Sequence, residues 1–488
     1  MKRNFKLFQI VLLILILLAT GCSQPAAKPT ITLQPCSGYW NSQQAQCGTL
    51  QVYENREARS GRKIDLKVVV IKASSQNPAP DPIFYLAGGP GGAAASEDAR
   101  YQQFPYSLSD NHDLVFVDQR GTGESNQVMV PTDQPDFSGM TPEEMDAAAK
   151  KWVADYLAKI NMDPRFYTTS VAMDDLDEVR QALGYDQINL AGFSYGATAA
   201  QYYLRQHEEH VRTVTLGMGS LLDIPVFELW AQRTQQALDG IFDLCMAQPS
   251  CQAAFPNLKA EFSGLMTRLA VEPKVLPYPP NGPDGTITFD VDFFSGTVRN
   301  MMKDAKNDPR LPLLIHRAAV EDDWEGFVSF IERGGGPEWW GNQMMDHIIR
   351  CSEKWSAFDP VEVAKLSQGS FMATRDTALA QNTALSCQYT PKGATPEGQS
   401  PQPGSKVPVL LFNGNLDPID PPGNIEGASK LFPNSLAVTL PYQAHQQSDM
   451  TVITCYFSIL NDFIQTGSAK GLDTSCMDLV RPPTFMLP

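Results

Sequence analysis

Residues 192–196 read GFSYG, and this segment lies where an apolar, strand-like run over 187–191 gives way to a helical pattern over 195–205. In a strand-to-helix turn of this kind the glycines allow strand and helix to approach closely, and the serine between them is held exposed on a strained backbone. The feature demands a sheet with helices packed on it. A GxSxG sequence without a strand before it and a helix after it would favour the alternative, a small-residue turn in which Ser194 is unreactive.

The rest of the chain alternates strands and helices around this turn. Apolar runs predict strands at residues 48–53, 64–72, 82–87, 113–118, 211–216, 407–412 and 436–440, and helical spacing predicts helices at 171–183 and 452–464. Such alternation is typical of an α/β fold with a mostly parallel, doubly wound sheet.

Strand signals almost vanish in the middle of the chain. Helical patterns follow one another there, at residues 227–246, 258–269, 313–333 and 344–355. We therefore predict a core in two parts, residues 36–222 and 404–488, separated by an inserted helical cap over residues 223–403.

The N-terminus has the pattern of an export signal. Three basic residues precede an apolar run over 10–19, which is too short for the ~20 residues that span a bilayer. The sequence ATGC at 19–22 is similar to a bacterial lipoprotein box, which predicts a signal peptide over residues 1–21, lipidation at Cys22 and a tether over 22–35. The expected location is the cell envelope, outside the cytoplasm, with the lipid as the only membrane contact. The formal net charge of −16 argues against nucleic acid as a partner.

The cysteine count agrees with export. Of nine cysteines, eight remain when Cys22 is set aside, an even number that predicts four disulfides in an oxidising compartment. Eight cysteines allow 105 pairings, and the shortest loops are closed by Cys36–Cys47, Cys245–Cys251, Cys351–Cys387 and Cys455–Cys476. Zinc is a weaker interpretation because CxxC pairs are missing from the sequence and His207 and His210 are three residues apart, not four as in a zincin helix. We predict no metal and no cofactor.

A reactive serine needs an imidazole to take its proton and a carboxylate to orient that imidazole. Among six histidines, only His445 follows both the turn and the strand at 407–412, as the order Ser, acid, His requires. Asp417 is the preferred acid because it comes first after that strand, and Asp420 is the competing candidate.

A glycine-rich loop, AGGPGG over 87–92, follows the strand at 82–87. Backbone N–H groups in this loop, together with the N–H that follows the nucleophile, are where such a fold would stabilise an oxyanion. Pro90 has no N–H, so Gly89 and Tyr195 are the predicted donors. The loop lacks the GK[ST] ending of a phosphate-binding P-loop.

Four motifs together resemble the prolyl aminopeptidase and tripeptidyl aminopeptidase group of α/β-hydrolases, its exported branch above all. They are AGGPG at 87–91, DQRGTGES at 118–125, GFSYG at 192–196, and Asp417-Pro418 followed by two prolines at 421–422. The resemblance spans roughly residues 36–480. It implies an α/β-hydrolase fold with a cap, a triad of Ser194, Asp417 and His445, the same two oxyanion donors, and a structural turn containing Asp118 and Arg120. Ala87 and Ala444 depart from the family pattern, where His and Gly are common, and this leaves substrate preference open.

The leading prediction is therefore a serine aminopeptidase that releases short N-terminal fragments from peptide substrates through an acyl-enzyme. The alternatives are a carboxylesterase with the same triad and a non-catalytic surface lipoprotein. Glu353 is the candidate to bind the substrate's N-terminal amine, because it follows Cys351 in the cap and lies between tryptophans at 339–340 and 355. The competing interpretation is a solvated carboxylate on a helix.

Overall fold

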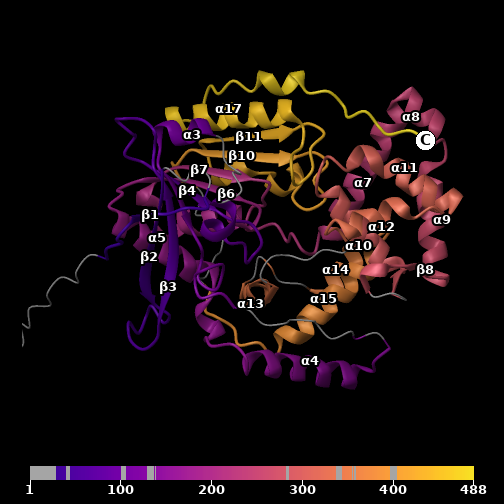
Figure 1. Ribbon diagram of the computed structural model, residues 1–488, viewed down its shortest axis with the longest axis horizontal. Helices are drawn as coiled ribbons and strands as arrows, with labels where there is room; N and C mark the ends of the chain where they lie inside the picture. The colour runs from indigo at the N-terminus through magenta and orange to yellow at the C-terminus, as the bar shows by residue number, and fades with distance from the viewer. Residues whose placement is uncertain are drawn as a thin grey trace, which may run out of the picture.

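The computed structural model describes residues 29–39, 44–99, 106–128, 137, 139–281, 285–336, 343–353, 356, 359–395 and 404–488. The predicted signal peptide, Cys22 and the three tryptophans named above lie outside the described residues. A nine-stranded sheet forms the centre of the molecule (Figure 1). Its strands are β1 Gln34–Pro35, β2 Ala45–Tyr53, β3 Lys63–Ile71, β4 Ile83–Leu86, β5 Leu114–Val117, β6 Ile188–Phe193, β7 Val211–Gly217, β10 Val409–Gly414 and β11 Ser435–Leu440.

The strand order is β1-β2-β3-β5-β4-β6-β7-β10-β11. Strands β1, β2, β3 and β5 pair antiparallel, whereas every pair from β5 to β11 is parallel. Strands β4 and β5 are short and fully buried, as their unbroken apolar sequences predict. The carboxyl ends of β4, β6 and β10 therefore meet at one edge of the sheet, where open α/β sheets bind their ligands.

Helices cover both faces of the sheet. Helices α5 (Thr169–Leu183) and α6 (Tyr195–Gln206) pack on one face, and α17 (Met450–Thr466) lies on the other beside the short α3 (Tyr106–Asn111) (Figure 1). Strand residues of opposite parity feed the two apolar clusters, Leu190 one and Ala191 the other, because successive side chains point to opposite faces. The mostly parallel α/β sheet predicted from the sequence is confirmed.

The segment between β7 and β10 forms the cap and has an apolar core of its own. Its helices are α7 Trp230–Ala247, α8 Pro249–Ala254, α9 Leu258–Val271, α10 Val291–Met302, α11 Leu311–His316, α12 Glu325–Glu332, α13 Gln343–Ser352, α14 Pro360–Leu366 and α15 Ala373–Cys387. Helix α4 (Pro142–Leu157), which contacts α15, was not predicted.

Two details of the cap differ from the prediction. A hairpin of β8 (Lys274–Pro277) and β9 (Thr286–Phe289) interrupts the helices. The single helix expected over 313–333 is broken at Asp322, which adopts a left-handed φ of 55°. The Asp322 carboxylate accepts a hydrogen bond from the Trp324 indole, so a short polar side chain competes with helix geometry at this point.

Four disulfides join Cys36 to Cys47, Cys245 to Cys251, Cys351 to Cys387 and Cys455 to Cys476. These are the nearest-neighbour pairs expected from the sequence. The third ties α13 to α15 within the cap, and the fourth ties α17 to the C-terminal segment. In the part of the chain that the structure describes, none of the helices is both long and apolar enough to cross a membrane.

Candidate active site

Ser194 occupies the turn between β6 and α6 with φ 55° and ψ −124°, a left-handed conformation that side chains rarely adopt. Both flanking glycines are required by space. A Cβ on Gly192 would lie 2.1 Å from the carbonyl oxygen of Gly196, and a Cβ on Gly196 would lie 2.0 Å from that of Leu86. The strained backbone thus holds the serine at the carboxyl edge of the sheet.

His445 links Ser194 to Asp417. Its Nε2 lies 3.0 Å from Ser194 Oγ, and its Nδ1 lies 2.8 Å from Asp417 Oδ2. The other oxygen of Asp417 accepts hydrogen bonds from the N–H groups of Ile419 and Asp420 at 2.8 and 2.9 Å. Because the carboxylate accepts, the proton resides on Nδ1 and Nε2 is left to accept from the serine hydroxyl. The three side chains are buried together, in the arrangement of a nucleophile, a general base and its orienting acid.

Asp420, the competing acid, stands in a second position. Its Oδ2 is 3.9 Å from His445 Nδ1, too far for a hydrogen bond, and its Oδ1 accepts from Ser220 Oγ and from Asn424 Nδ2. Burial raises the pKa of Asp420 to about 6 despite the attraction of His445. Burial disfavours the charged form of His445, but Asp417 and Asp420 outweigh this and raise its pKa above the ordinary value.

The glycine-rich loop reaches the nucleophile. Gly89 lines the pocket beside Ser194, and its φ of 124° suits glycine, since a Cβ there would lie 2.6 Å from the Gly91 nitrogen. The N–H of Gly92 bonds the carbonyl of Gly88 at 3.1 Å and closes the loop. Tyr195 begins α6, where backbone N–H groups and the helix dipole favour negative charge. The structure therefore brings both predicted oxyanion donors next to Ser194.

Asp118 anchors the segment that follows this loop. Its carboxylate accepts hydrogen bonds from the N–H groups of Ala95, Ser96 and Glu124 and from the Ser96 hydroxyl, at 2.7 to 3.0 Å. Arg120 makes a two-pronged ion pair with Asp175 on α5. Both side chains are buried, so they hold the turn in place and do not face a substrate.

Glu353 is not among the described residues that line the pocket. It follows the end of α13, where its oxygens accept from the N–H and the hydroxyl of Thr169 at 2.6 and 2.9 Å. Thr169 is the first residue of α5, and a carboxylate is stabilised at a helix N-terminus. The Thr169 hydroxyl also meets the Tyr195 hydroxyl at 2.9 Å. The geometry does not support the predicted role in binding a substrate amine and indicates instead that Glu353 joins the cap to the core; nor is it solvated, since 2% of it is exposed.

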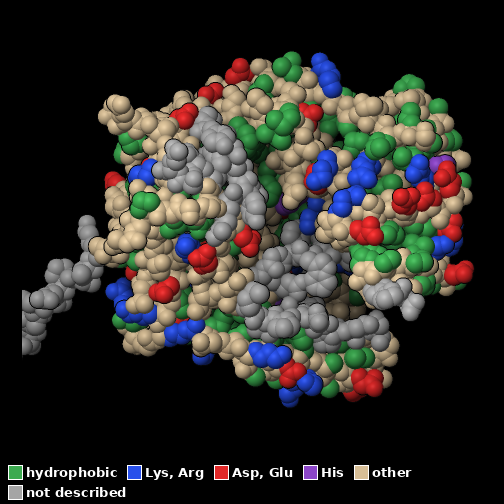
Figure 2. All heavy atoms as spheres, viewed as in Figure 1, with side chains coloured by type: hydrophobic (Ala, Val, Ile, Leu, Met, Phe, Trp, Pro, Cys, Tyr) green, Lys and Arg blue, Asp and Glu red, His purple; other side chains and the backbone are tan. Residues whose placement is uncertain are grey.

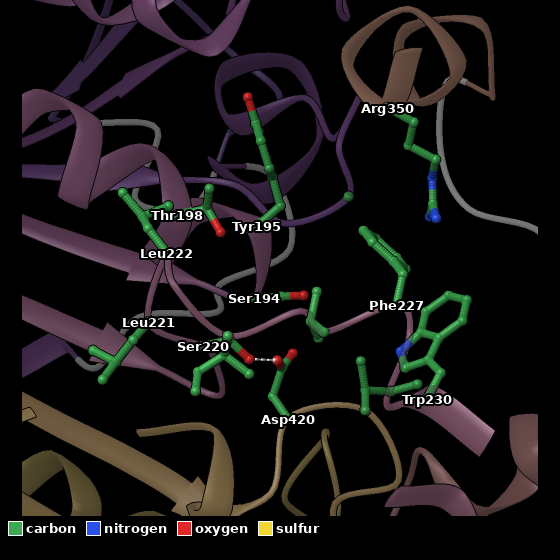
Figure 3. A pocket seen from close by; sticks show the side chains of 14 residues that line it. Ser194, Tyr195, Thr198, Ser220, Leu221, Leu222, Phe227, Trp230, Arg350 and Asp420 are labelled. Atoms are coloured by element: carbon green, nitrogen blue, oxygen red, sulfur yellow. Dashed lines mark hydrogen bonds between the residues drawn. The ribbon is translucent and has the colours of Figure 1, made fainter. Parts of the chain in front are cut away.

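The pocket beside Ser194 opens toward the cap. Ser194 points into it, with Ser220 and Asp420 on one side and Phe227 and Trp230 on the other, while Arg350 extends from α13 toward Phe227 (Figure 3). The Arg350 guanidinium lies 3.9 Å from the centre of the Phe227 ring and pairs with Asp346 at 2.7 Å. The free volume is only about 40 Å³, room for very few water molecules. The walls are mainly apolar, and Asp420 is the one acidic side chain among the described lining residues.

Sequence reasoning missed Arg350, Phe227 and Ser220. No local motif marks them, because the turn of α13 and the loop after β7 bring them to the pocket from distant parts of the chain. His207, rejected as a metal ligand from the sequence, has its Nε2 3.0 Å from Asp174 Oδ1. His347 lies close to Cys351 and Cys387, but the two sulfurs are joined to each other.

Comparison with known proteins agrees with this geometry. The profile of the α/β hydrolase fold matches residues 81–446, about three quarters of the chain. The chain therefore belongs to the α/β-hydrolase family.

Curated relatives have peptidase names. The chain is 28% identical over 207 residues to a tripeptidyl aminopeptidase of Streptomyces lividans, which is 39% of this chain and 38% of that protein. It is 28% identical over 189 residues to the serine protease Hip1 of Mycobacterium tuberculosis, 35% of each chain. The matches thus span less than two fifths of the length of either relative.

Solved structures with similar chains include a proline iminopeptidase of Mycobacterium smegmatis, at 13% identity and a TM-score of 0.39 over 86% of this chain and 98% of that one. An α/β hydrolase from a deep-sea metagenome, MGS-M2, has 13% identity and a TM-score of 0.38 over 83% and 96% of the two chains.

Proposed function

We propose that this protein is an exported serine aminopeptidase that releases short fragments from peptide N-termini through an acyl-enzyme. The observation that carries the proposal is His445, which contacts Ser194 and Asp417 at hydrogen-bond distance beside a pocket roofed by cap residues. The peptidase names of the two partial relatives support peptides as substrates.

In the proposed mechanism Ser194 Oγ attacks the carbonyl carbon while its proton passes to His445 Nε2. Asp417 stabilises the imidazolium through Nδ1. The N–H groups of Gly89 and Tyr195 stabilise the negative charge on the carbonyl oxygen. His445 then protonates the departing amine, and water attacks the acyl-enzyme by the same route in reverse.

A carboxylesterase with the same triad is the second candidate. The apolar walls of the pocket favour it, because Leu221, Leu222 and Ile224 suit an acyl chain as well as an amino-acid side chain. The geometry of the triad argues against the third possibility, a non-catalytic binding protein.

A panel of chromogenic substrates separates the candidates: prolyl, alanyl and tripeptidyl anilides beside short-chain and long-chain esters. Ser194→Ala should abolish turnover of every substrate that the wild type cleaves, with at most ~10³–10⁴-fold acceleration over water remaining. Ser295→Ala is the matched control, since this serine is fully buried in α10. Equal rates for Ser194→Ala and wild type would exclude the serine mechanism.

N-acetylated peptides test the exopeptidase assignment. An aminopeptidase should cleave them far more slowly than peptides with a free amine, because acetylation removes the positive charge that distinguishes an N-terminus from an internal peptide bond. Equal rates for blocked and free peptides would favour the esterase or an endopeptidase.

The proposed location is the cell envelope, with a lipid on Cys22. The four disulfides support an oxidising compartment. Cys22→Ser should move the protein from the membrane fraction to the soluble fraction, and an unchanged membrane fraction would contradict the lipid anchor.

A further inference from the structure

A second cavity lies on the opposite face of the sheet from α6. Its volume is about 400 Å³, and it is partly open. The ends of β4, β6 and β7, helix α17 and the two residues that follow His445 form its walls. A volume of this size falls in the range of small-molecule sites, whereas the pocket under the cap has a tenth of it.

Sequence neighbours of Ser194 and His445 line the cavity. Phe193 precedes Ser194, lines the cavity and packs its ring on His445 with centroids 5.3 Å apart. Gln446 and Gln447 follow His445 and form the adjacent wall. The backbone of Gln446 is fixed by hydrogen bonds with Lys303 and Ala305 of the cap at 2.7 and 3.2 Å.

The lining is aromatic and uncharged. Tyr85, Tyr456 and Phe457 supply rings, Ile453 and Met218 supply aliphatic surface, and no charged residue is among the described lining residues. Figure 2 shows apolar side chains gathered on the surface around α17, the helix that forms this wall. A charged group would lose its hydration here without gaining a counter-charge, so the cavity suits a neutral, largely apolar group.

One polar group in the cavity lacks a partner. Thr215, on β7, lines the cavity with 2% of its surface exposed, and its hydroxyl has no hydrogen-bond partner among the described residues. A buried hydroxyl without a partner is costly. A ligand with a polar atom at this depth would satisfy it.

We propose that this cavity binds the first side chain of the departing fragment, and that it prefers an uncharged aromatic side chain, tyrosine before phenylalanine. His445 must protonate the leaving amine, so the departing fragment lies against His445, and this cavity is bounded by its neighbours in the chain. The tyrosine hydroxyl would meet Thr215. The inference rests on the proposed acyl-enzyme mechanism and adds the specificity on its leaving side.

Acyl transfer tests the inference directly. The acyl-enzyme is formed from an activated ester, and amino-acid amides are added as acceptors in competition with water. The acceptor nitrogen bonds to the acyl carbon as the bond to Ser194 Oγ breaks, and the amine proton passes through His445 to that oxygen. The ratio of transfer to hydrolysis measures how well each acceptor occupies the leaving side.

The expected order is tyrosine amide, phenylalanine amide, then glycine amide. An aromatic side chain should gain about tenfold or more over glycine from burial, and tyrosine about 2- to 10-fold over phenylalanine from one hydrogen bond. Lysine amide and aspartic acid α-amide should resemble glycine amide. Equal ratios for all acceptors would overturn the proposal.

Two variants connect the preference to the cavity. Thr215→Val, nearly the same shape, should remove the preference for tyrosine over phenylalanine and keep the preference of both over glycine. Ile453→Trp should fill the cavity and remove the aromatic preference altogether. Val271→Trp, at an exposed position of the cap with 85% of its surface accessible, is the control and should change neither ratio.

The outcomes also separate this inference from the function on which it rests. If esters acylate Ser194 but anilides are not cleaved, the aminopeptidase proposal fails while the acceptor order still decides the role of the cavity. If Thr215→Val retains the tyrosine preference, or Ile453→Trp folds and retains the aromatic preference, the side chain binds elsewhere. If no substrate acylates the enzyme, both proposals are refuted.

Discussion

Arg120→Lys should destabilise the protein strongly, although it keeps the positive charge. The guanidinium is 1% exposed and donates five hydrogen bonds, two to Asp175 and the others to the carbonyl oxygens of Tyr53, Glu54 and Phe166. These acceptors surround the planar group on several sides. A lysine ammonium has three donors at one point and cannot reach all of them.

The expected size of the effect follows from the acceptors that are left. At least two buried acceptors lose their donor, and each such loss costs about 1–3 kcal/mol, so the free energy of unfolding should fall by about 2–6 kcal/mol. Asp175 retains a second partner, because Arg56 Nη1 lies 2.6 Å from its Oδ1. The decrease in the free energy of unfolding should therefore be smaller than that expected for a buried carboxylate with no partner left.

Arg165→Lys is the matched control. Arg165 makes the same forked contact with Asp163, but its side chain is 61% exposed, and water replaces the lost hydrogen bonds. We would measure urea unfolding by circular dichroism without reductant, so that the disulfides stay intact. Arg165→Lys should match the wild type. If Arg120→Lys is as stable as the wild type, burial does not strengthen the forked contact between Arg120 and Asp175 in the way argued.

Four further predictions concern the site and the stability of the protein. Asp417→Ala should lower kcat by about 10⁴-fold, and Asp420→Ala far less, because Asp417 alone bonds His445; the reverse order in kinetic assays would make Asp420 the orienting acid. The pH profile of kcat/KM should rise with the deprotonation of His445, at an apparent pKa above 6.5. Asp420→Asn should lower this pKa, because it removes a negative charge that favours the His445 imidazolium. An unchanged profile would contradict an electrostatic effect of Asp420 on His445. Burial raises the pKa of Asp308 well above 3.8, so above pH 4 the unfolded chain releases a proton that the folded state keeps, and the free energy of unfolding falls. Asp308→Asn should therefore raise Tm by about 1–3 °C at pH 8 and by less at pH 4. A Tm difference that does not change with pH would refute this explanation. Reductant should lower Tm, since each lost disulfide removes about 2–5 kcal/mol, and an unchanged Tm with all thiols free would contradict the stabilising role of the bridges.

The parts of the site that a short motif defines could be predicted from the sequence. Ser194 was identified by its glycines, and His445 by its place after the strand that became β10. Asp417 is preferred over Asp420 because it comes first after the strand, with Gly414 to shape the turn and Pro418 to fix the exit. In the structure, the N–H groups of Ile419 and Asp420 hold one oxygen of Asp417 while the other meets the histidine.

Glu353 shows where such reasoning fails. Its neighbours in the sequence indicated a position in the cap but not the direction of its side chain. Helix α13 ends at Ser352, so Glu353 no longer follows the helical face that carries Arg350, one turn earlier, to the pocket. The hairpin of β8 and β9 was missed for a related reason, because four-residue strands with exposed alternate positions are too short for a clear pattern.

The order of the strands determines when the candidate active site can be completed during synthesis. Strand β10 pairs with β7 although the whole cap lies between them in the chain, and both Asp417 and His445 come after β10. A nascent chain that already contains Ser194, its glycine loop and a complete cap still lacks a base. The contacts of His445 with Ser194 and Asp417 therefore form only after the last strands are made and join the sheet.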